Sequence, residues 1–210
     1  MTELVLASTS PARLAVLRSA GVSPRAIPSH VDEDAVVAAA SSGRDQITAA
    51  EVVAVLARAK AEAVAHALPD SDALVFGGDS AFECQGEIWG KPHTPERARE
   101  RIRRMSGSSG VLYSGHWVID LRPGHGRAGV GAVDTARVHF GTMSDQEVDD
   151  YVATGEPLEV AGSFTLDGRG QAFITRVEGA PSCVIGLSTP VLRELVHSLG
   201  VPWTSLWEQC

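Results

Sequence analysis

The segment 73–92, ALVFGGDSAFECQGEIWGKP, combines a strand of the buried type with residues that packing alone does not require. An apolar run ends at Phe76, and an acid, Asp79, follows after two glycines. A cation, Lys91, follows near the end of the segment. A carboxylate can orient a water molecule or bind a metal, and a cation can compensate the charge of a phosphate. The segment therefore predicts chemistry as well as fold.

Two residues in the middle of this segment, Gln85-Gly86, predict a hairpin turn. The resulting register pairs Phe82 with Trp89, and it brings the acid end of one strand near the lysine end of the other. Strict alternation puts the acid and the lysine on opposite faces of the sheet. Their convergence therefore requires a bulge, for which Gly90 is a natural site, or a departure from regular sheet.

A second group of polar residues lies where the first predicted strand meets the first predicted helix, in ELVLASTSPARLAVL. Ser8, Thr9 and Ser10 arrive at a helix N-terminus, whose free amides favour an anion. Arg13 lies in the first helical turn, the unfavourable end for a cation unless something negative is bound nearby. Taken alone, Arg13 is a solvated side chain. Together with the hydroxyls and amides, it indicates a phosphate site.

A third unusual residue is Lys60, in a predicted helix with the sequence EVVAVLARAKAEAVAHAL. Apolar residues recur at intervals of three and four along this helix, and Lys60 falls within their stripe: Val53, Leu56, Val64 and Ala67. One interpretation is a buried stem with its ammonium in water. The other is a lysine that faces an active site.

The elements that must position these residues alternate between helix and strand. Apolar periodicity predicts helices over 11–20, 48–67, 95–105, 145–154 and 190–199, strands over 3–7, 25–30, 73–78, 111–121, 130–140, 160–166 and 171–178, and the hairpin over 80–90. Capping boxes mark two helix starts, at Thr48 with Glu51 and at Ser144 with Glu147. This order predicts an α/β fold with a mixed sheet.

Composition, net charge and cysteine spacing argue against several classes of protein. The chain has 210 residues, 44% hydrophobic and 21% charged, which suits one globular domain over 1–210. A formal net charge of -8 argues against a large nucleic-acid footprint. No apolar run approaches the roughly 18 residues of a membrane span, and no basic leader is present, so we expect a cytoplasmic protein. The cysteines are too widely spaced for a disulfide framework or a zinc site: Cys84, Cys183 and Cys210.

The sequence resembles the Maf family over nearly its whole length. Six ordered blocks carry the resemblance: LVLASTSPARLAVLRSAGV from Leu4, SHVDED at 29–34, LARAKAEAVA at 56–65, GGDS with GKP within 77–92, MSGSSGVLYSGHWVI at 105–119, and YVATGEPLEVAG with VEGAPSCVIGLSTP toward the end. The resemblance implies a mixed, twisted central sheet flanked by helices, similar to inosine triphosphate pyrophosphatases, with a cleft between two lobes.

The resemblance also implies an activity. Members of the family look like nucleoside triphosphate pyrophosphatases, which hydrolyse the α-β phosphoanhydride of standard or non-standard nucleotides with Mg²⁺ or Mn²⁺. Asp79 takes the catalytic aspartate position, as metal ligand or base, and Glu33 is matched to a second metal ligand. The matched catalytic lysines and substrate-binding residues are Lys60, Lys91, Ser8, Ser10, Arg13, Glu33 and Glu156. Without the resemblance, Glu33 would be a solvated loop residue and Glu156 a turn residue.

Three further matched positions bear on base selectivity: Ala12, Ser80 and Asp167. In the uracil- and thymine-preferring branch they resemble arginine, threonine and glutamine, and in the 7-methylguanine branch tryptophan, glutamine and glutamate. Ala12 and Ser80 leave a roomier entrance, and an ionised Asp167 can only accept hydrogen bonds. We therefore expect broad nucleotide use, tilted toward guanine- or cytosine-type donor edges. Cys183 and Ser188 also depart from the family pattern, where they replace asparagine and proline.

A second functional hypothesis is a nucleotide-sensing regulatory protein that acts on septum formation through protein contacts. The presence of a water-activating carboxylate among cations favours the enzyme. The resemblance also implies a homodimer, for which the C-terminal segment VPWTSLWEQC offers an apolar surface. Trp203, Leu206 and Trp207 could equally cover the core.

Overall fold

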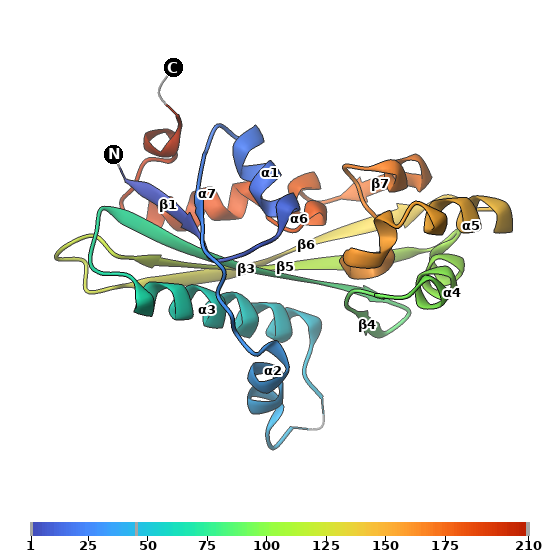
Figure 1. Cartoon of the computed structure of the whole chain (residues 1–210), viewed down its shortest axis with the longest axis horizontal. Coiled ribbons are helices and arrows are strands. Elements are labelled where there is room, and N and C mark those ends of the chain that lie inside the picture. The colour runs from blue at the N-terminus through green and yellow to red at the C-terminus, as the bar shows by residue number, and fades with distance from the viewer. Residues whose placement is uncertain (1, 45, 209–210) are drawn as a thin grey trace.

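The computed structural model describes residues 2–44 and 46–208. Within these residues, seven strands form one mixed sheet in the order β2-β1-β3-β5-β6-β7, with β4 paired to β3. Helices cover both faces of this sheet, with α1, α6 and α7 on one side and α3 on the other (Figure 1). The predicted α/β fold with a mixed, twisted sheet flanked by helices is confirmed.

The elements have the following bounds. The strands are β1 (Glu3–Leu6), β2 (Arg25–Ala26), β3 (Ala73–Cys84), β4 (Glu87–Trp89), β5 (Ser109–Asp120), β6 (Gly129–Phe140) and β7 (Ile174–Glu178). The α-helices are α1 (Pro11–Ser19), α2 (Glu33–Ser41), α3 (Ala49–Ala67), α4 (Pro95–Met105), α5 (Asp145–Ala153), α6 (Pro181–Ile185) and α7 (Thr189–Ser198). Short 3-10 helices are η1 (Glu156–Glu159), η2 (Ala161–Ser163), η3 (Arg169–Phe173) and η4 (Trp203–Leu206).

The core divides between two ends of the molecule. At one end, Val75 and Phe76 point to opposite faces of β3, where they join two different apolar clusters. At the other end, Phe82 packs with Ile102 of α4 and Phe140 of β6. Strands β3, β5 and β6 run through both ends, and these are the two lobes that the resemblance implied. The cleft between them stays a prediction.

Two glycines let α3 approach the sheet closely. A Cβ atom on Gly77 of β3 would collide with the backbone carbonyl of Ala57, and one on Gly115 of β5 would collide with that of Val53. Both obstacles are α3 backbone, which cannot rotate away as a side chain can. The bare backbone at these two positions therefore determines how deep α3 lies, and with it the position of the residues that α3 carries.

The predicted hairpin and the two predicted capping boxes are confirmed. Phe82 pairs with Trp89 across the turn, in the predicted register. The capping boxes that begin α3 and α5 form, with Glu51 and Glu147 accepting from the Thr48 and Ser144 backbone amides.

Several elements differ from the prediction. Helix α6 was not predicted, and the strand predicted over 171–178 begins only at Ile174, after η3. The strand predicted over 160–166 is wrong, because Gly162 and Ser163 have φ values of 78° and 64°, which interrupt extended backbone and form η2. The strand predicted over 25–30 has only two residues, and Pro28 cannot donate a ladder hydrogen bond. Helix α2 was not predicted, since none of its residues is buried and it lacks the apolar stripe of an amphipathic helix.

The C-terminal segment covers the core. Leu206 is buried, and Trp203 packs against the same cluster beside α7. Trp207 lies against Gly21 and is 46% exposed. Cys84 and Cys183 are free, buried thiols, whereas Cys210 lies outside the described residues. No helix in the described ranges has the length and apolar character to cross a membrane.

Candidate active site

Lys60 and Asp79 form a buried ion pair between α3 and β3. The Lys60 Nζ atom lies 2.7 Å from Asp79 Oδ1, and the two residues are only 7% and 9% exposed. Because the ammonium is not in water, the interpretation of Lys60 as a snorkelling side chain is wrong. The structure brings together two residues predicted to be catalytic, through the close contact of α3 with the sheet.

Glu33 completes this cluster from a third element. Its Oε1 atom lies 2.8 Å from Lys60 Nζ, so one ammonium bridges two carboxylates. Glu33 is the first residue of α2, which Asp32 caps by accepting from the Ala35 amide. The Glu33 side chain is half-exposed, whereas Asp79 is buried. Glu33 therefore lies on a helix and is paired with Lys60, although its side chain stays partly exposed, so it is not a loop residue.

Arg13 lies beside this cluster and is fixed by three acceptors. Its Nε donates to the Gly186 carbonyl at 2.8 Å, its Nη2 to Ser80 Oγ at 2.9 Å, and its Nη1 to Ser8 Oγ at 3.3 Å. The side chain is buried, so Arg13 is not the solvated residue that it would be in isolation. Ser10 caps α1 by accepting from the Arg13 amide at 3.4 Å.

Burial and neighbouring charges shift the ionisation of these groups. Burial raises the pKa of Asp79 above its ordinary value, against the opposing effect of Lys60 and Arg13. Burial lowers the pKa of Arg13, although a guanidinium stays protonated in proteins. A carboxylate with a raised pKa is a stronger proton acceptor, and perturbed groups of this kind are typical of active sites.

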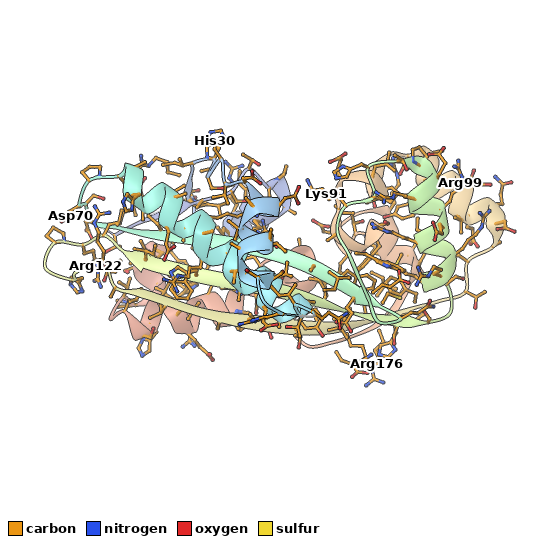
Figure 2. The ribbon with its side chains drawn as sticks, turned by 90° about the horizontal axis from the view of Figure 1, so that it is seen from below. His30, Asp70, Lys91, Arg99, Arg122 and Arg176 are labelled. Atoms are coloured by element: carbon orange, nitrogen blue, oxygen red, sulfur yellow. The ribbon has the colours of Figure 1, made fainter. Side chains whose placement is uncertain are left out.

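Lys91 does not join the cluster. The β3–β4 ladder ends at Trp89, and the ion pair that the structure gives Lys91 is with Glu159 and not with Asp79. The Lys91 side chain is about half exposed and lies 3.7 Å from Glu159. It belongs to the end of the molecule that carries α4, where Arg99 is also found (Figure 2). Its role toward a phosphate stays a prediction.

Glu156 also lies apart from Asp79. Its carboxylate accepts hydrogen bonds from the side chains of Tyr151 and Thr165 and from the amides of Arg169 and Gly170. These contacts join Glu156 to α5, to Thr165 and to the start of η3. The structure therefore gives no contact between Glu156 and the cluster built on Lys60.

The three selectivity positions lie on three different segments of the structure. Ala12 is half-buried in the first turn of α1, and Asp167 is exposed in the segment between η2 and η3. The hydroxyl of Ser80 accepts from Arg13 and lies 3.4 Å from Ser114 Oγ. Ser80 thus orients Arg13, a contact that the sequence did not reveal. The role of Asp167 toward a base stays a prediction.

Sequence reasoning missed a buried histidine next to this network. His116 of β5 accepts through Nε2 from the Ser188 amide at 2.8 Å. Burial, with a smaller effect from Arg13, lowers its pKa to about 4. The available signal was Ser188 itself, because the proline of the family pattern has no amide hydrogen to donate. The 186–188 segment is thus contacted by Arg13 at Gly186 and by His116 at Ser188.

The donors present fit a metal only in part. Among the described residues there is no group of three or more His, Cys, Asp or Glu side chains that could hold an ion. Asp79 and Glu33 offer two carboxylates around Lys60 Nζ. Mg²⁺ is commonly bound by one or two carboxylates together with substrate phosphates and water. The pair therefore fits a metal that arrives with its substrate.

Comparison with known proteins identifies the family of the chain. A family model described as Maf-like protein matches residues 3–199. A protein of Leifsonia xyli subsp. xyli named nucleoside triphosphate pyrophosphatase is 55% identical over 208 residues, covering 98% of this chain and 97% of the relative. A protein of the same name from Nocardia farcinica is 50% identical over 206 residues, covering 97% and 96%. The chain therefore belongs to the Maf family.

Proposed function

We propose that this chain is a nucleoside triphosphate pyrophosphatase that hydrolyses the α-β phosphoanhydride to a nucleoside monophosphate and pyrophosphate. The observation that carries the proposal is the buried Asp79, 2.7 Å from Lys60. Its raised pKa suits a proton acceptor. The relatives named for this activity support the same conclusion.

Different residues of the chain have different roles in the reaction. Asp79 takes a proton from the attacking water, whose oxygen forms a new P–O bond as the bridging P–O bond breaks and pyrophosphate leaves. Lys60 and Arg13 compensate the negative charge that develops on the phosphates. The hydroxyls and amides at the start of α1 hold the phosphate chain. Lys91 supplies a further cation from the α4 end.

We assign the metal requirement to Mg²⁺ or Mn²⁺, with Asp79 and Glu33 as its protein ligands. When bound, such an ion neutralises phosphate charge and lowers the pKa of a coordinated water. Lys60 already holds both carboxylates close together, and a carboxylate pair with phosphate oxygens suits a hard cation.

The regulatory alternative is not favoured. A protein that only senses nucleotides needs a binding pocket, but it does not need a buried proton acceptor. Incubation of the purified protein with a panel of nucleoside triphosphates and Mg²⁺ or Mn²⁺ tests the proposal. We expect equal amounts of monophosphate and pyrophosphate. No turnover on any nucleotide would contradict the enzyme.

We also propose three finer properties: the base preference, the compartment and the oligomeric state. We propose broad nucleotide use tilted toward guanine- or cytosine-type bases, based on Ala12, Ser80 and Asp167, and a substrate panel would contradict it by a strong preference for UTP and dTTP. The free, buried thiols fit a reducing, cytoplasmic compartment. The homodimer rests on the family alone, and sedimentation that shows a monomer at micromolar concentration would exclude it.

A further inference from the structure

The carboxylate of Glu156 is surrounded by hydrogen-bond donors from its own chain. Oε1 accepts from Thr165 Oγ1 at 2.5 Å, from Tyr151 OH at 3.0 Å and from the Gly170 amide at 3.0 Å. Oε2 accepts from the Arg169 amide at 3.0 Å. A carboxylate offers about four lone-pair sites. These four contacts therefore leave little capacity for a substrate, and the negative charge of Glu156 would repel a phosphate.

These contacts close a tight turn over residues 165–170. The donors lie at its two ends, Thr165 on one side and Arg169 with Gly170 on the other. Gly168 fits inside the turn, where a Cβ atom would lie 2.6 Å from Thr165 Oγ1 and 2.8 Å from the Glu156 carboxyl carbon. Asp167 lies between these anchors in the chain, and it is exposed. Glu156 thus determines the conformation of the turn that presents Asp167.

The turn is connected to the strand that carries the active site. Gly162, a few residues before the turn, lies so close to Phe82 that a Cβ atom would approach its ring to 2.8 Å. Phe82 is two positions after Ser80 and three after Asp79 on β3. The segment that leads into the turn therefore rests on the strand that delivers the catalytic carboxylate.

We propose that Glu156 is a positioning residue for base selectivity, which holds the 165–170 turn so that Asp167 meets the nucleobase. The inference rests on the proposed function for its substrate class, and it replaces the substrate contact that the family match assigned to Glu156. Glu156 acts through Asp167 and does not touch the nucleotide.

The test compares equilibrium affinities for GMP and UMP, the monophosphate products, which need no turnover. Glu156→Gln turns one acceptor oxygen into an amide donor that faces other donors, so the turn loses its anchor. We expect the ratio of the two Kd values to move toward unity by about tenfold, the scale of one hydrogen bond to a charged group. Glu194→Gln removes an exposed carboxylate from α7 and should leave the ratio unchanged.

A double mutant separates positioning from general stability. In the Asp167→Asn background, Glu156→Gln should leave the ratio unchanged, because both changes act through the same side chain. Thr165→Val removes one donor and should give a smaller change in the same direction, which keeps the test informative if Glu156→Gln does not fold. Amide exchange at Arg169 and Gly170 should become faster in Glu156→Gln and not in Asp167→Asn.

Three results would contradict the inference. The inference is wrong if Glu156→Gln weakens both monophosphates equally, if its effect adds fully to that of Asp167→Asn, or if neither monophosphate binds the parent. A parent that binds GMP and UMP selectively but hydrolyses no triphosphate would contradict the proposed function and leave this inference standing.

Discussion

Arg13 and Lys91 were matched to similar tasks, but their surroundings differ. Arg13 is buried with three acceptors, whereas Lys91 is exposed with one distant carboxylate. Arg13→Ala should lower the free energy of unfolding by about 2 kcal/mol or more, because it leaves buried acceptors unpaired. Lys91→Ala should change it by less than about 0.5 kcal/mol. Both variants should lower kcat/KM for triphosphates.

Chemical denaturation and steady-state kinetics of the two variants check this prediction. An Arg13→Ala protein as stable as the parent would contradict the role of Arg13 in holding Gly186 and Ser80. A Lys91→Ala protein with the kcat/KM of the parent would remove Lys91 from the phosphate site.

His116 should make stability depend on pH. Its pKa is about 4 in the fold and 6.5 when unfolded, so between these values the unfolded chain binds the extra proton. The free energy of unfolding should therefore fall as pH drops from about 6.5 to about 4, by about 3 kcal/mol in total. Arg13 and Asp134 are the charged groups that act on the ring.

His116→Gln keeps an acceptor for the Ser188 amide but does not titrate. Denaturation curves between pH 4 and 7.5 should show a slope for the parent that exceeds that of the variant by about one proton. Equal slopes would mean that His116 is accessible to protons in the folded state.

For single residues, the sequence alone identified those that interrupt a local pattern. Lys60 stood out because a cation interrupts an apolar stripe, and Arg13 because it lies at the wrong end of a helix. The Ser80 contact with Arg13 and the donors around Glu156 could not be predicted, since they join segments far apart in the chain and depend on side-chain directions that spacing does not encode.

Among the elements, the contact between α3 and the sheet matters most for the site. Gly77→Ala places a methyl group against the α3 backbone and should displace the helix that carries Lys60. We expect a loss of about 2 kcal/mol or more in the free energy of unfolding, together with a fall in kcat. Gly90→Ala is the matched control, because nothing lies within 4 Å of its added methyl group.

Urea denaturation measures the free energy of unfolding of the two alanine variants, and steady-state kinetics measures their kcat. A Gly77→Ala protein that unfolds like Gly90→Ala would show that α3 can move without cost, and the close contact would not position Lys60.

Element prediction succeeded where local chemistry is strong. Capping boxes and apolar periodicity located α3 and α5 to within a residue or two, because hydrogen bonds within a few residues determine them. It failed for α2, an exposed helix held by its cap and by Glu33. It also failed at Gly162, where packing against Phe82 overrides strand propensity.

The whole molecule has two apolar ends that share long strands. Strands β3, β5 and β6 have 12 residues each and contribute to the core at both ends. Because neither end can unfold without breaking ladders that the other uses, we expect one cooperative transition. Calorimetry should give equal calorimetric and van't Hoff enthalpies, and two resolved transitions would show that the ends fold independently.

The position of the site follows from this architecture. Asp79 lies on β3 between Phe76, which belongs to the core of one end, and Phe82, which belongs to the core of the other. The α/β class could be predicted from the alternation of elements. The division of the core was implied only by the family resemblance and not by the alternation of elements, because it depends on which faces the helices cover.

The most direct test of the central claim is pyrophosphate release by Asp79→Asn. The substitution is nearly isosteric and removes the negative charge that accepts a proton and pairs with Lys60. Circular dichroism establishes that the variant is folded. With the best nucleoside triphosphate and saturating Mg²⁺ or Mn²⁺, we predict a loss of at least about 100-fold in kcat. A folded variant that keeps most of the parent's rate would contradict the assignment of Asp79 as the catalytic carboxylate.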